Sequence, residues 1–487
     1  MAKTVRPKLR TSGLLSLFCH SPGFKLGAVA KTSGEKGVRA VDAAIQVLKH
    51  LARDARATVP VVDEYCDAYR HLFPEVRSYE CFKYLHLGIL ASTGRKSLPE
   101  LAKVVNLTSS QSLHHFLVNS PWSASEVEDI RLNQIQAAVS GKVVALLIDE
   151  TGDRKKGKAT DYVARQYLGS VGKVDAGIVS VNAYGVCEGI TFPLLCEVFK
   201  PKGRLKEGDS YRSKTEIASG LVERLLERGF EFEVVLADSL YGESSQFIQA
   251  LEEKGLQWVL SIRSDHGVWI PASERVRWNR WCRFERHLSD GKTEERYIRE
   301  LVYGKRSRRT YWQLTTNPET LPEASTSFVM TNLAKKPSEL KKTLGDLYGL
   351  RTWVEYAFRQ CKQELGWTAY RLTCFRDIER WWTLIFSVYS LVSLQAWRRK
   401  EARERARENE ASPEIPDGES LLSQHPEWSE KCSWKSTLNN LRLLVQPVVM
   451  LWLLCPWLSL FENQSLVRAF HQLLAQVNQA QAYFLHA

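Results

Sequence analysis

The spacing of apolar residues changes near residue 140. Before that point the pattern is helical, without convincing strand alternation. From there to residue 262, short apolar runs with the period of a strand alternate with stripes of helical period. Three strands that can form a meander, followed by alternating helices and strands, predict a mixed α/β sheet covered by helices. The expected strands are 143–149, 176–184, 190–198, 234–237 and 258–262, and the expected helices are 214–228 and 244–254.

The helical first part contains a segment with a helix–turn–helix pattern, SLPELAKVVNLTSSQSLHHFLV, from Ser97 to Val118. Ser97 and Glu100 have the spacing of a capping box, which would start the first helix. The second helix is expected to turn apolar side chains inward, namely Leu113, Phe116 and Leu117. Such a pair is either plain helical packing or a DNA-reading unit, and in the second case Gln111 would face a groove.

Acidic residues follow the apolar runs of two predicted strands. The run VVALLI ends at Ile148 and leads into Asp149 and Glu150, and the run VVLA leads into Asp238. An acid there is typical of a turn, and Asp149 could also be a helix N-cap or a metal ligand. If the first and fourth strands are neighbours, Asp149 and Asp238 meet at one sheet edge, where Mg²⁺ would relieve their repulsion. Because a strand alternates its faces, only one of Asp149 and Glu150 points into the site, and we choose Asp149, which directly follows the apolar run.

A polar stripe marks a later helix that begins near Leu347. At 100° per residue, its four polar residues share an arc of about 60°. They are Tyr348, Arg351, Glu355 and Lys362. One explanation is a solvent face with an i,i+4 ion pair between Arg351 and Glu355. The rest of the helix is largely apolar, however, and this favours a working surface that supplies a third carboxylate.

Composition narrows the function classes. The chain has 487 residues, a formal net charge of +12 and a pI of about 9.1. This length predicts two or three domains. The basic surplus indicates either a polyanionic partner such as nucleic acid or a well-solvated cationic surface.

Cysteine use and hydropathy bear on the compartment. The ten cysteines form no C-x-x-C pair, which argues against a disulfide framework or zinc ribbon and favours a reducing cytosol. The start MAKTVRPKLRTSG has no apolar signal-peptide run. One stretch, Leu443–Phe461, is apolar enough to raise the question of a membrane span, but it contains Pro447 and Pro456. A buried helical hairpin is the favoured interpretation.

The segment between about 265 and 335 has alternating stretches, RYIRELVYG, TYWQLTT and TSFVMTN, and predicts a β-rich insertion. The expected organisation is a helical N-terminal DNA-binding region, the first part of the core, the insertion, the final core helices, and a linker with a helical C-terminal region. Their bounds are 1–140, 141–264, 265–336, 337–400 and 401–487.

The spacing Tyr-x2-Arg-x3-Glu-x6-Lys of the polar stripe resembles the YREK signature of bacterial insertion-sequence transposases of the DDE type. The stretch DETGDRKKGKATDYVARQYLGSVGKVDAGIVSVNAYG and the stretch ADSLYG resemble the regions around the first and second catalytic aspartates of the insertion-sequence 701 family. The resemblance covers about residues 140 to 400. It implies a ribonuclease-H-like mixed sheet core, interrupted by a β-rich insertion and flanked by helical regions.

The resemblance also implies a catalytic triad of Asp149, Asp238 and Glu355. These acids would hold two Mg²⁺ ions about 3.5–4 Å apart, which Mn²⁺ can replace, for in-line phosphodiester displacement. Arg351 and Lys362 would hold phosphates near the cut.

The remaining contacts with DNA are expected as follows. Tyr348 would grip the transposon end, and Trp312 is the choice for an insertion aromatic that stacks on a flipped base during a hairpin step. Lys155 and Lys156 would contact the backbone, unless they belong to a solvated loop.

The function expected is a cut-and-paste transposase that binds double-stranded DNA, both terminal repeats and target. It would act as a homodimer in the bacterial cytoplasm, on the nucleoid when bound to DNA and with no membrane partner. Two alternatives stay open. One is a metal-dependent nuclease that never joins DNA, and the other is a DNA-binding protein whose carboxylates are structural.

Overall fold

The computed structural model describes residues 53–487, apart from 170, 269, 271–272, 288–292, 305–307, 335–336, 409–420 and 487. Residues 55–487 group together as one unit. The first 52 residues of the predicted helical N-terminal region, and most of the predicted linker after residue 400, lie outside the described residues.

The centre of the sheet has the order β4–β3–β1–β5–β6. These strands are β1 (Ala145–Arg154), β3 (Lys173–Cys187), β4 (Ile190–Val198), β5 (Val234–Ala237) and β6 (Trp258–Ile262). β3 pairs antiparallel with both β1 and β4, whereas β5 pairs in parallel with both β1 and β6. Three antiparallel strands followed by two parallel ones form the mixed sheet of a ribonuclease-H-like core, so the predicted fold class is confirmed.

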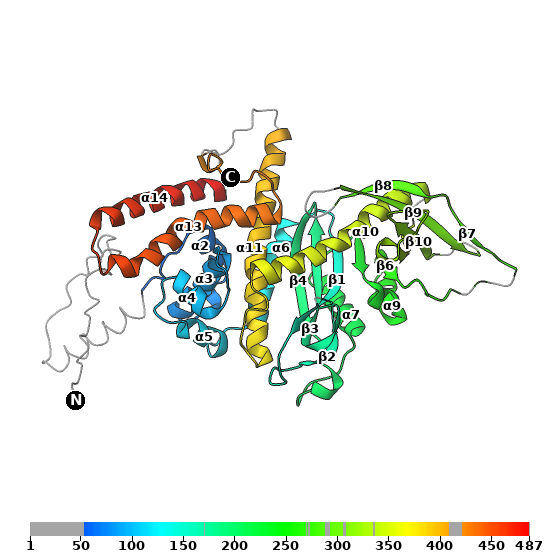
Figure 1. Ribbon diagram of the computed structural model, residues 1–487, viewed down its shortest axis with the longest axis horizontal. Helices are drawn as coiled ribbons and strands as arrows, with labels where there is room; N and C mark the ends of the chain where they lie inside the picture. The colour runs from blue at the N-terminus through cyan, green and yellow to red at the C-terminus, as the bar shows by residue number, and fades with distance from the viewer. Residues whose placement is uncertain are drawn as a thin grey trace, which may run out of the picture. The chain divides into compact units, whose positions relative to one another are not determined.

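The strands after β6 extend the same sheet. They are β7 (Val276–Trp278), β8 (Cys282–His287), β9 (Thr293–Tyr303), β10 (Thr310–Thr315) and β11 (Ser327–Thr331). The last of them, β11, pairs antiparallel with β6, so the β-rich insertion continues the core sheet, which reaches eleven strands in the described part of the chain. Figure 1 shows these strands on the side of the sheet away from the N-terminal helices.

Helices cover the sheet. They are α6 (Ala124–Ala138), α7 (Lys214–Glu227), α8 (Ser239–Gly242), α9 (Ser245–Glu253), α10 (Pro337–Arg359), the π-helical turn η5 (Gln360–Glu364) and α11 (Phe375–Glu408). A capping box of Ser213 and Glu216 starts α7, and its apolar stripe, which includes Ile217 and Leu221, is buried. In Figure 1, α11 stands between the sheet and the N-terminal helices, and it packs against β4, α6 and α3.

The described N-terminal helices are α2 (Pro60–Asp67), α3 (Val76–Leu90), α4 (Leu98–Val104) and α5 (Gln111–Val118), with a short turn η2 (Arg70–Leu72). The helix–turn–helix pattern is confirmed as the pair α4 and α5, and the three predicted inward residues are buried. The capping box at its start is wrong: Ser97 caps no backbone N–H, and Glu100 pairs with Lys103 instead.

The C-terminal part consists of α13 (Trp434–Leu458) and α14 (Gln464–His486), which pack on each other. Pro447 and Pro456 lie inside α13 without ending it. This helix is long and apolar enough to cross a membrane, and only 28% of its most apolar window is buried. The predicted hairpin within Leu443–Phe461 is wrong, because one helix runs through to Leu458. The predicted burial holds only in part: the first half of α13 packs into the core, whereas its end exposes apolar side chains such as Trp457.

Candidate active site

Asp149 and Asp238 lie beside each other on neighbouring parallel strands. β1 and β5 pair in parallel register up to Ile148 and Ala237, so the next residue of each strand is an aspartate. The prediction that the first and fourth strands are neighbours is confirmed. The two carboxyl groups are close enough for the charge of Asp238 to act on Asp149.

The chain does not leave the sheet at Asp149, which corrects the predicted end of the first strand. β1 continues to Arg154 because β3 is long enough to pair with it as far as Gly177. Asn182 is the partner of Asp149 on β3. Asp149 therefore marks only the point where the pairing of β1 with β5 stops. Helix α10 contacts both of these strands, and α8 contacts β5.

Asp149 and Glu150 make different contacts, as the alternation of a strand requires. Oε1 of Glu150 forms an ion pair with Nζ of Lys214 on α7, at 2.8 Å. Asp149 is buried, and its Oδ1 accepts the N–H of Glu150 at 2.7 Å. Glu150 is thus engaged with a helix on the sheet, and Asp149 is the acid next to Asp238.

Burial raises the pKa of Asp149 to about 7. The Arg351 guanidinium opposes this shift, and the negative charge of Asp238 adds to it. A buried carboxyl beside a second one strongly favours any cation that can take the place of water around both.

Asp238 has two roles in the geometry. It is the N-cap of α8, and its Oδ1 accepts the N–H of Leu240 at 2.9 Å. The N-cap explanation weighed for Asp149 therefore applies to Asp238. This bond fixes the orientation of the carboxylate at the edge of the sheet.

Helix α10 places Arg351 near the two acids and Tyr348 against β6. The Tyr348 hydroxyl lies 3.1 Å from Oγ of Ser261 on β6, and Nη1 of Arg351 donates to Tyr348 at 3.5 Å. Burial by itself would lower the pKa of Arg351, but the charges of Tyr348, Asp149, Asp238 and Glu355 raise it. The guanidinium thus lies within the electrostatic reach of all three predicted triad acids.

Glu355 lies one turn beyond Arg351, and its side chain is 61% exposed. The two side chains approach only to 3.9 Å, between Nη2 and Oε1. Within the described residues, no group of three His, Cys, Asp or Glu side chains is close enough to share a metal ion. Asp149 and Asp238 together suit a divalent cation, and Glu355 completes the set only if its side chain turns inward.

Lys362 does not continue the stripe of α10. The π-helical turn η5 begins at Gln360, and such a turn holds more residues than an α-helical one, so the predicted angle no longer applies. Nζ of Lys362 donates to the carbonyl of Gly152 at 2.9 Å. Burial lowers the pKa of this lysine. The ammonium group of Lys362 thus lies beside β1 at Gly152, three residues beyond Asp149.

Two predicted backbone contacts differ in exposure. Nζ of Lys155 pairs with Asp153 at 2.7 Å and lies 3.6 Å from the ring centre of Tyr370, so it is held inside the protein rather than presented to DNA. Lys156 is exposed. Gln111 is also exposed, as the first residue of α5.

Trp312 is not placed to stack on a base. It is fully buried in β10, where its indole N–H donates to Thr310 at 2.9 Å. Trp278 on β7 is instead 63% exposed, and the guanidinium of Arg299 lies 5.7 Å from the centre of its ring. The same guanidinium lies 4.4 Å from the ring centre of Trp281. The sequence pattern does not single out this pair, because a tryptophan in an alternating run looks the same on either face of a sheet.

Comparison with known proteins identifies the family. Residues 71–292 match the family described as DDE superfamily endonuclease, and residues 206–391 match the family described as Transposase DDE domain. Together with the ribonuclease-H-like sheet and its paired aspartates, these matches define a DDE-type enzyme that acts on DNA phosphodiester bonds.

The chain is 51% identical, over 328 residues, to the probable transposase for insertion sequence element IS701 of Microchaete diplosiphon. The aligned region spans 67% of this chain and 86% of that relative. The chain therefore belongs to the insertion-sequence 701 family of DDE transposases.

Proposed function

We propose that this transposase cuts and joins DNA at the ends of its insertion sequence by divalent-metal-dependent phosphoryl transfer, with Asp149, Asp238 and Glu355 as the ligands. The observation that carries the proposal is the buried Asp149 beside Asp238, with a pKa raised to about 7 and Arg351 near both. Two Mg²⁺ ions bound there would supply an activated water or DNA 3′-hydroxyl and stabilise the departing oxygen.

The residues of the chain have separate tasks in this proposal. Arg351 is only partly exposed, at 26% of its side chain, and it donates to the Tyr348 hydroxyl, so its planar fork is oriented before a phosphate arrives. Lys362 offers a point charge farther along β1. Glu355 turns inward when DNA and metal bind, because an ion pair of 3.9 Å with an exposed partner costs little to break.

A hairpin step at the DNA ends is proposed on the family resemblance. Trp278 replaces Trp312 as the residue that stacks on a flipped base, because its ring is exposed and the nearby Arg299 is cationic. Base–aromatic stacking contributes about 1–3 kcal/mol per base.

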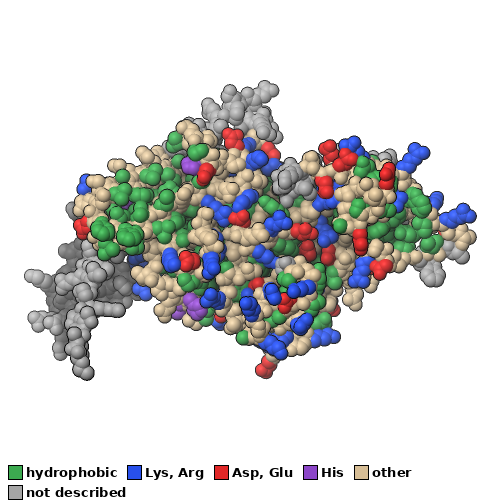
Figure 2. All heavy atoms as spheres, in the orientation of Figure 1, with side chains coloured by type: hydrophobic (Ala, Val, Ile, Leu, Met, Phe, Trp, Pro, Cys, Tyr) green, Lys and Arg blue, Asp and Glu red, His purple; other side chains and the backbone are tan. Residues whose placement is uncertain are grey.

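We also propose that the enzyme works as a homodimer, since joining two ends requires two active sites. The end of α13 and the beginning of α14 expose a patch of large apolar side chains on one face, and this patch is the proposed contact (Figure 2). It consists of Met450, Leu453, Trp457, Leu460, Phe461 and Leu466. Single exposed apolar residues are common on protein surfaces, whereas a contiguous patch of them indicates an interaction site. The cytoplasm, with the nucleoid as the DNA-bound location, remains the proposed compartment.

The decisive experiment incubates the enzyme with duplexes that carry its own element ends and with Mg²⁺, and resolves the products by strand. We expect nicked, double-cut and joined products from the wild type. Asp149→Asn and Glu355→Gln should each reduce the rate by at least about 10³ while they retain DNA affinity. Glu150→Gln is the matched control and should react normally.

The outcomes separate the alternatives. Cut but unjoined products would make the protein a nuclease. Binding without any Mg²⁺-dependent cut, in wild type and variants alike, would make it a DNA-binding protein with structural carboxylates.

A further inference from the structure

The segment between β1 and β3 forms a hairpin that the mechanism does not use. Its first strand is β2 (Ala164–Leu168), which the sequence pattern did not predict, and it pairs with the beginning of β3. One face pairs Tyr167 with Val174 and Arg165 with Ala176. Tyr167 is 56% exposed and Val174 is 52% exposed, and Arg165 is exposed too. An aromatic, an aliphatic and a cationic side chain thus share an uncovered β-ribbon face.

The opposite face of the hairpin is anchored. Leu168 is buried against Gly152 of β1 and Gly177 of β3. A Cβ at Gly152 would come within 2.6 Å of Leu168, and one at Gly177 within 2.8 Å. A Cβ at Gly177 would also lie 2.8 Å from the carbonyl oxygen of Asp153, which cannot rotate away, so glycine is needed there. Leu168 thus holds the hairpin to the same strand that carries Asp149.

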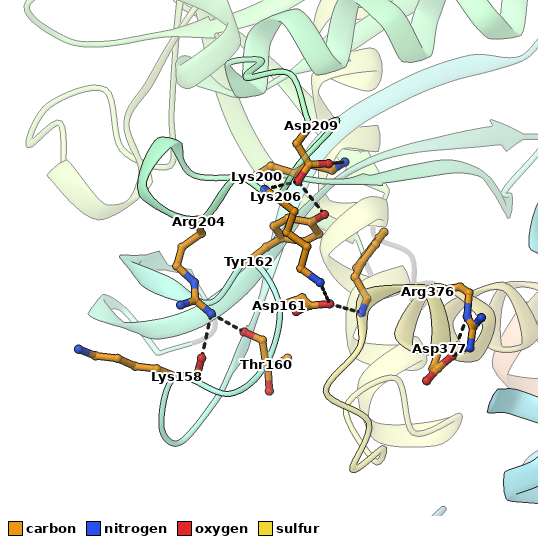
Figure 3. A network of polar contacts seen from close by, with 11 residues as sticks. Lys158, Thr160, Asp161, Tyr162, Lys200, Arg204, Lys206, Asp209, Arg376 and Asp377 are labelled. Carbon is orange, nitrogen blue, oxygen red and sulfur yellow. Dashed lines mark hydrogen bonds and ion pairs between the residues drawn. The ribbon is translucent and has the colours of Figure 1, made fainter.

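Two loops beside the hairpin are tied to each other. They are residues 155–163, after β1, and residues 199–213, after β4 (Figure 3). Nη2 of Arg204 donates to the carbonyls of Lys158, at 2.8 Å, and Thr160, at 3.1 Å.

Two aspartates also hold these loops in place through ion pairs and hydrogen bonds. Asp161 accepts Nζ of Lys206 at 2.6 Å and the N–H of Phe375, at the start of α11, at 2.8 Å. Asp209 accepts Nζ of Lys200 at 2.5 Å and the Tyr162 hydroxyl at 2.9 Å. These contacts join both loops into one unit (Figure 3), and an ion pair of Arg154 with Asp175 at 2.8 Å holds the hairpin to the end of β1. We call the hairpin and both loops together the platform.

The cations of this platform fall into two groups. Those paired with acids hold the platform together, and they are Arg154, Lys155, Lys200, Lys206, Arg212 and Lys214. The others form no ion pair with any acid in the described part of the chain and are exposed, and they are Lys156, Lys158, Arg165, Lys173 and Lys202. Lys and Arg side chains gather on the lower middle of the face drawn in Figure 2, over β2, β3 and the loop after β4.

Strand geometry gives the distance from this platform to the paired aspartates. Arg154 lies five residues beyond Asp149 on β1, which corresponds to about 17 Å. On β3, Val174 lies eight residues from Asn182, the partner of Asp149, which corresponds to about 27 Å. At 3.4 Å per base pair, these lengths equal about 5 and 8 base pairs of duplex DNA.

We propose that the β2–β3 hairpin and its two loops bind the backbone of the duplex whose phosphate occupies the active site, about 5–8 base pairs from that phosphate. The unpaired cations contact phosphates without reading sequence, and Tyr167 and Val174 pack against the sugars. This inference rests on the proposed function for the location of the cut. It assigns a binding role to a surface outside the catalytic residues.

The first test is affinity for a labelled random-sequence duplex of about 30 base pairs, with Ca²⁺ in place of Mg²⁺. The variant is Arg165→Glu/Lys156→Glu, and the matched control is Lys431→Glu/Arg468→Glu, two exposed cations of the C-terminal region that form no ion pair with a described acid. Removal of one phosphate contact should weaken binding about eightfold at 0.1 M salt, so the double variant should bind about 60-fold more weakly, with a salt slope reduced by about 1.8. The control should bind like the wild type.

The second test is hydroxyl-radical footprinting on a duplex that spans an element end. In the double variant, protection about 5–8 base pairs from the cut should disappear while protection at the cut persists. Tyr167→Ser should weaken the same distal protection, and Tyr167→Phe should retain it. Thermal melts of each variant should match the wild type, because the replaced side chains are exposed.

The outcomes distinguish the two proposals. Wild-type cleavage with unchanged affinity and footprint in the double variant would overturn the platform and leave the transposase mechanism standing. A missing distal footprint in an enzyme that never cuts would support the platform and remove the mechanism. A wild type that binds no duplex would overturn both.

Discussion

At the scale of single residues, Asp149 couples stability to pH. Its pKa is about 7 in the folded chain against an ordinary 3.8, chiefly because it is buried. Between those pH values the folded state holds a proton that the unfolded chain has released, so this carboxyl makes the protein less stable as pH rises from about 4 to 7. Asp149→Asn removes the effect.

We therefore expect Asp149→Asn to raise the free energy of unfolding by about 2–4 kcal/mol at pH 8 and to change it little at pH 4. Urea unfolding at both pH values, without divalent metal, measures this. Equal stability of the variant and the wild type at pH 8 would mean that the carboxyl is not desolvated.

Binding of a divalent cation should offset the loss of stability that the buried, ionised Asp149 causes at high pH. A cation held by Asp149 and Asp238 stabilises only the folded state, by about 2.7 kcal/mol at a hundredfold excess over its dissociation constant. Mg²⁺ at pH 8 should therefore raise the melting temperature of the wild type and of Glu150→Gln, whose carboxylate pairs with Lys214 in the wild type. Asp149→Asn should lose the response. An equal rise in all three proteins would place the ion elsewhere.

At the scale of elements, Gly242 couples both sides of the active site. A Cβ at Gly242 would lie 1.8 Å from the carbonyl oxygen of Ser261, so α8 could not remain against β6. Asp238 caps α8, and the Ser261 hydroxyl contacts Tyr348. One methyl group would thus displace Asp238, a proposed metal ligand, together with Ser261, the contact of Tyr348.

Gly242→Ala should destabilise the protein by about 3 kcal/mol, since the clash involves backbone atoms that cannot rotate away, and it should abolish cleavage. Gly94→Ala is the control, because a Cβ at Gly94 meets nothing within 4 Å. Urea unfolding and the cleavage assay measure both effects. A stable and active Gly242→Ala variant would show that α8 does not fix the site.

Element by element, the sequence is informative where apolar runs are bounded by turn residues. The observed β4, β5 and β6 coincide with the predicted 190–198, 234–237 and 258–262. β2 escaped prediction because ARQYL buries only its last residue, and its pairing depends on the remote glycines that receive Leu168.

In the candidate site, too, the features set by local apolar runs could be predicted, and those set by remote contacts could not. Asp149 and Asp238 could be paired from strand order alone, because both directly follow the apolar runs of two strands that pair in parallel. The angular position of Lys362 around the helix depends on a π-helical turn, and the spacing of residues in the sequence does not reveal such a turn. The burial of Trp312 and the exposure of Trp278 depend on which face of the extended sheet is covered.

At the scale of the whole molecule, the apolar patch at the end of α13 and the beginning of α14 should decide the oligomeric state. Trp457 is 62% exposed and Phe461 is 70% exposed. Aromatic anchors of an interface typically contribute at least about 2 kcal/mol each, so Trp457→Glu/Phe461→Glu should weaken the dimer by about 10³. Light scattering coupled to size exclusion, without DNA, measures this over a range of concentrations.

The matched control is Val143→Glu/Leu421→Glu, which places the same charges at exposed apolar positions outside the patch and should leave the dimer intact. A wild type that stays monomeric and floats with lipid vesicles would assign the patch and α13 to a membrane surface. Joined DNA products require two active sites held at once, so the aromatic variant should still cut single ends but lose joining. Normal joining by a monomeric variant would contradict the dimer and require the two ends to be handled in succession.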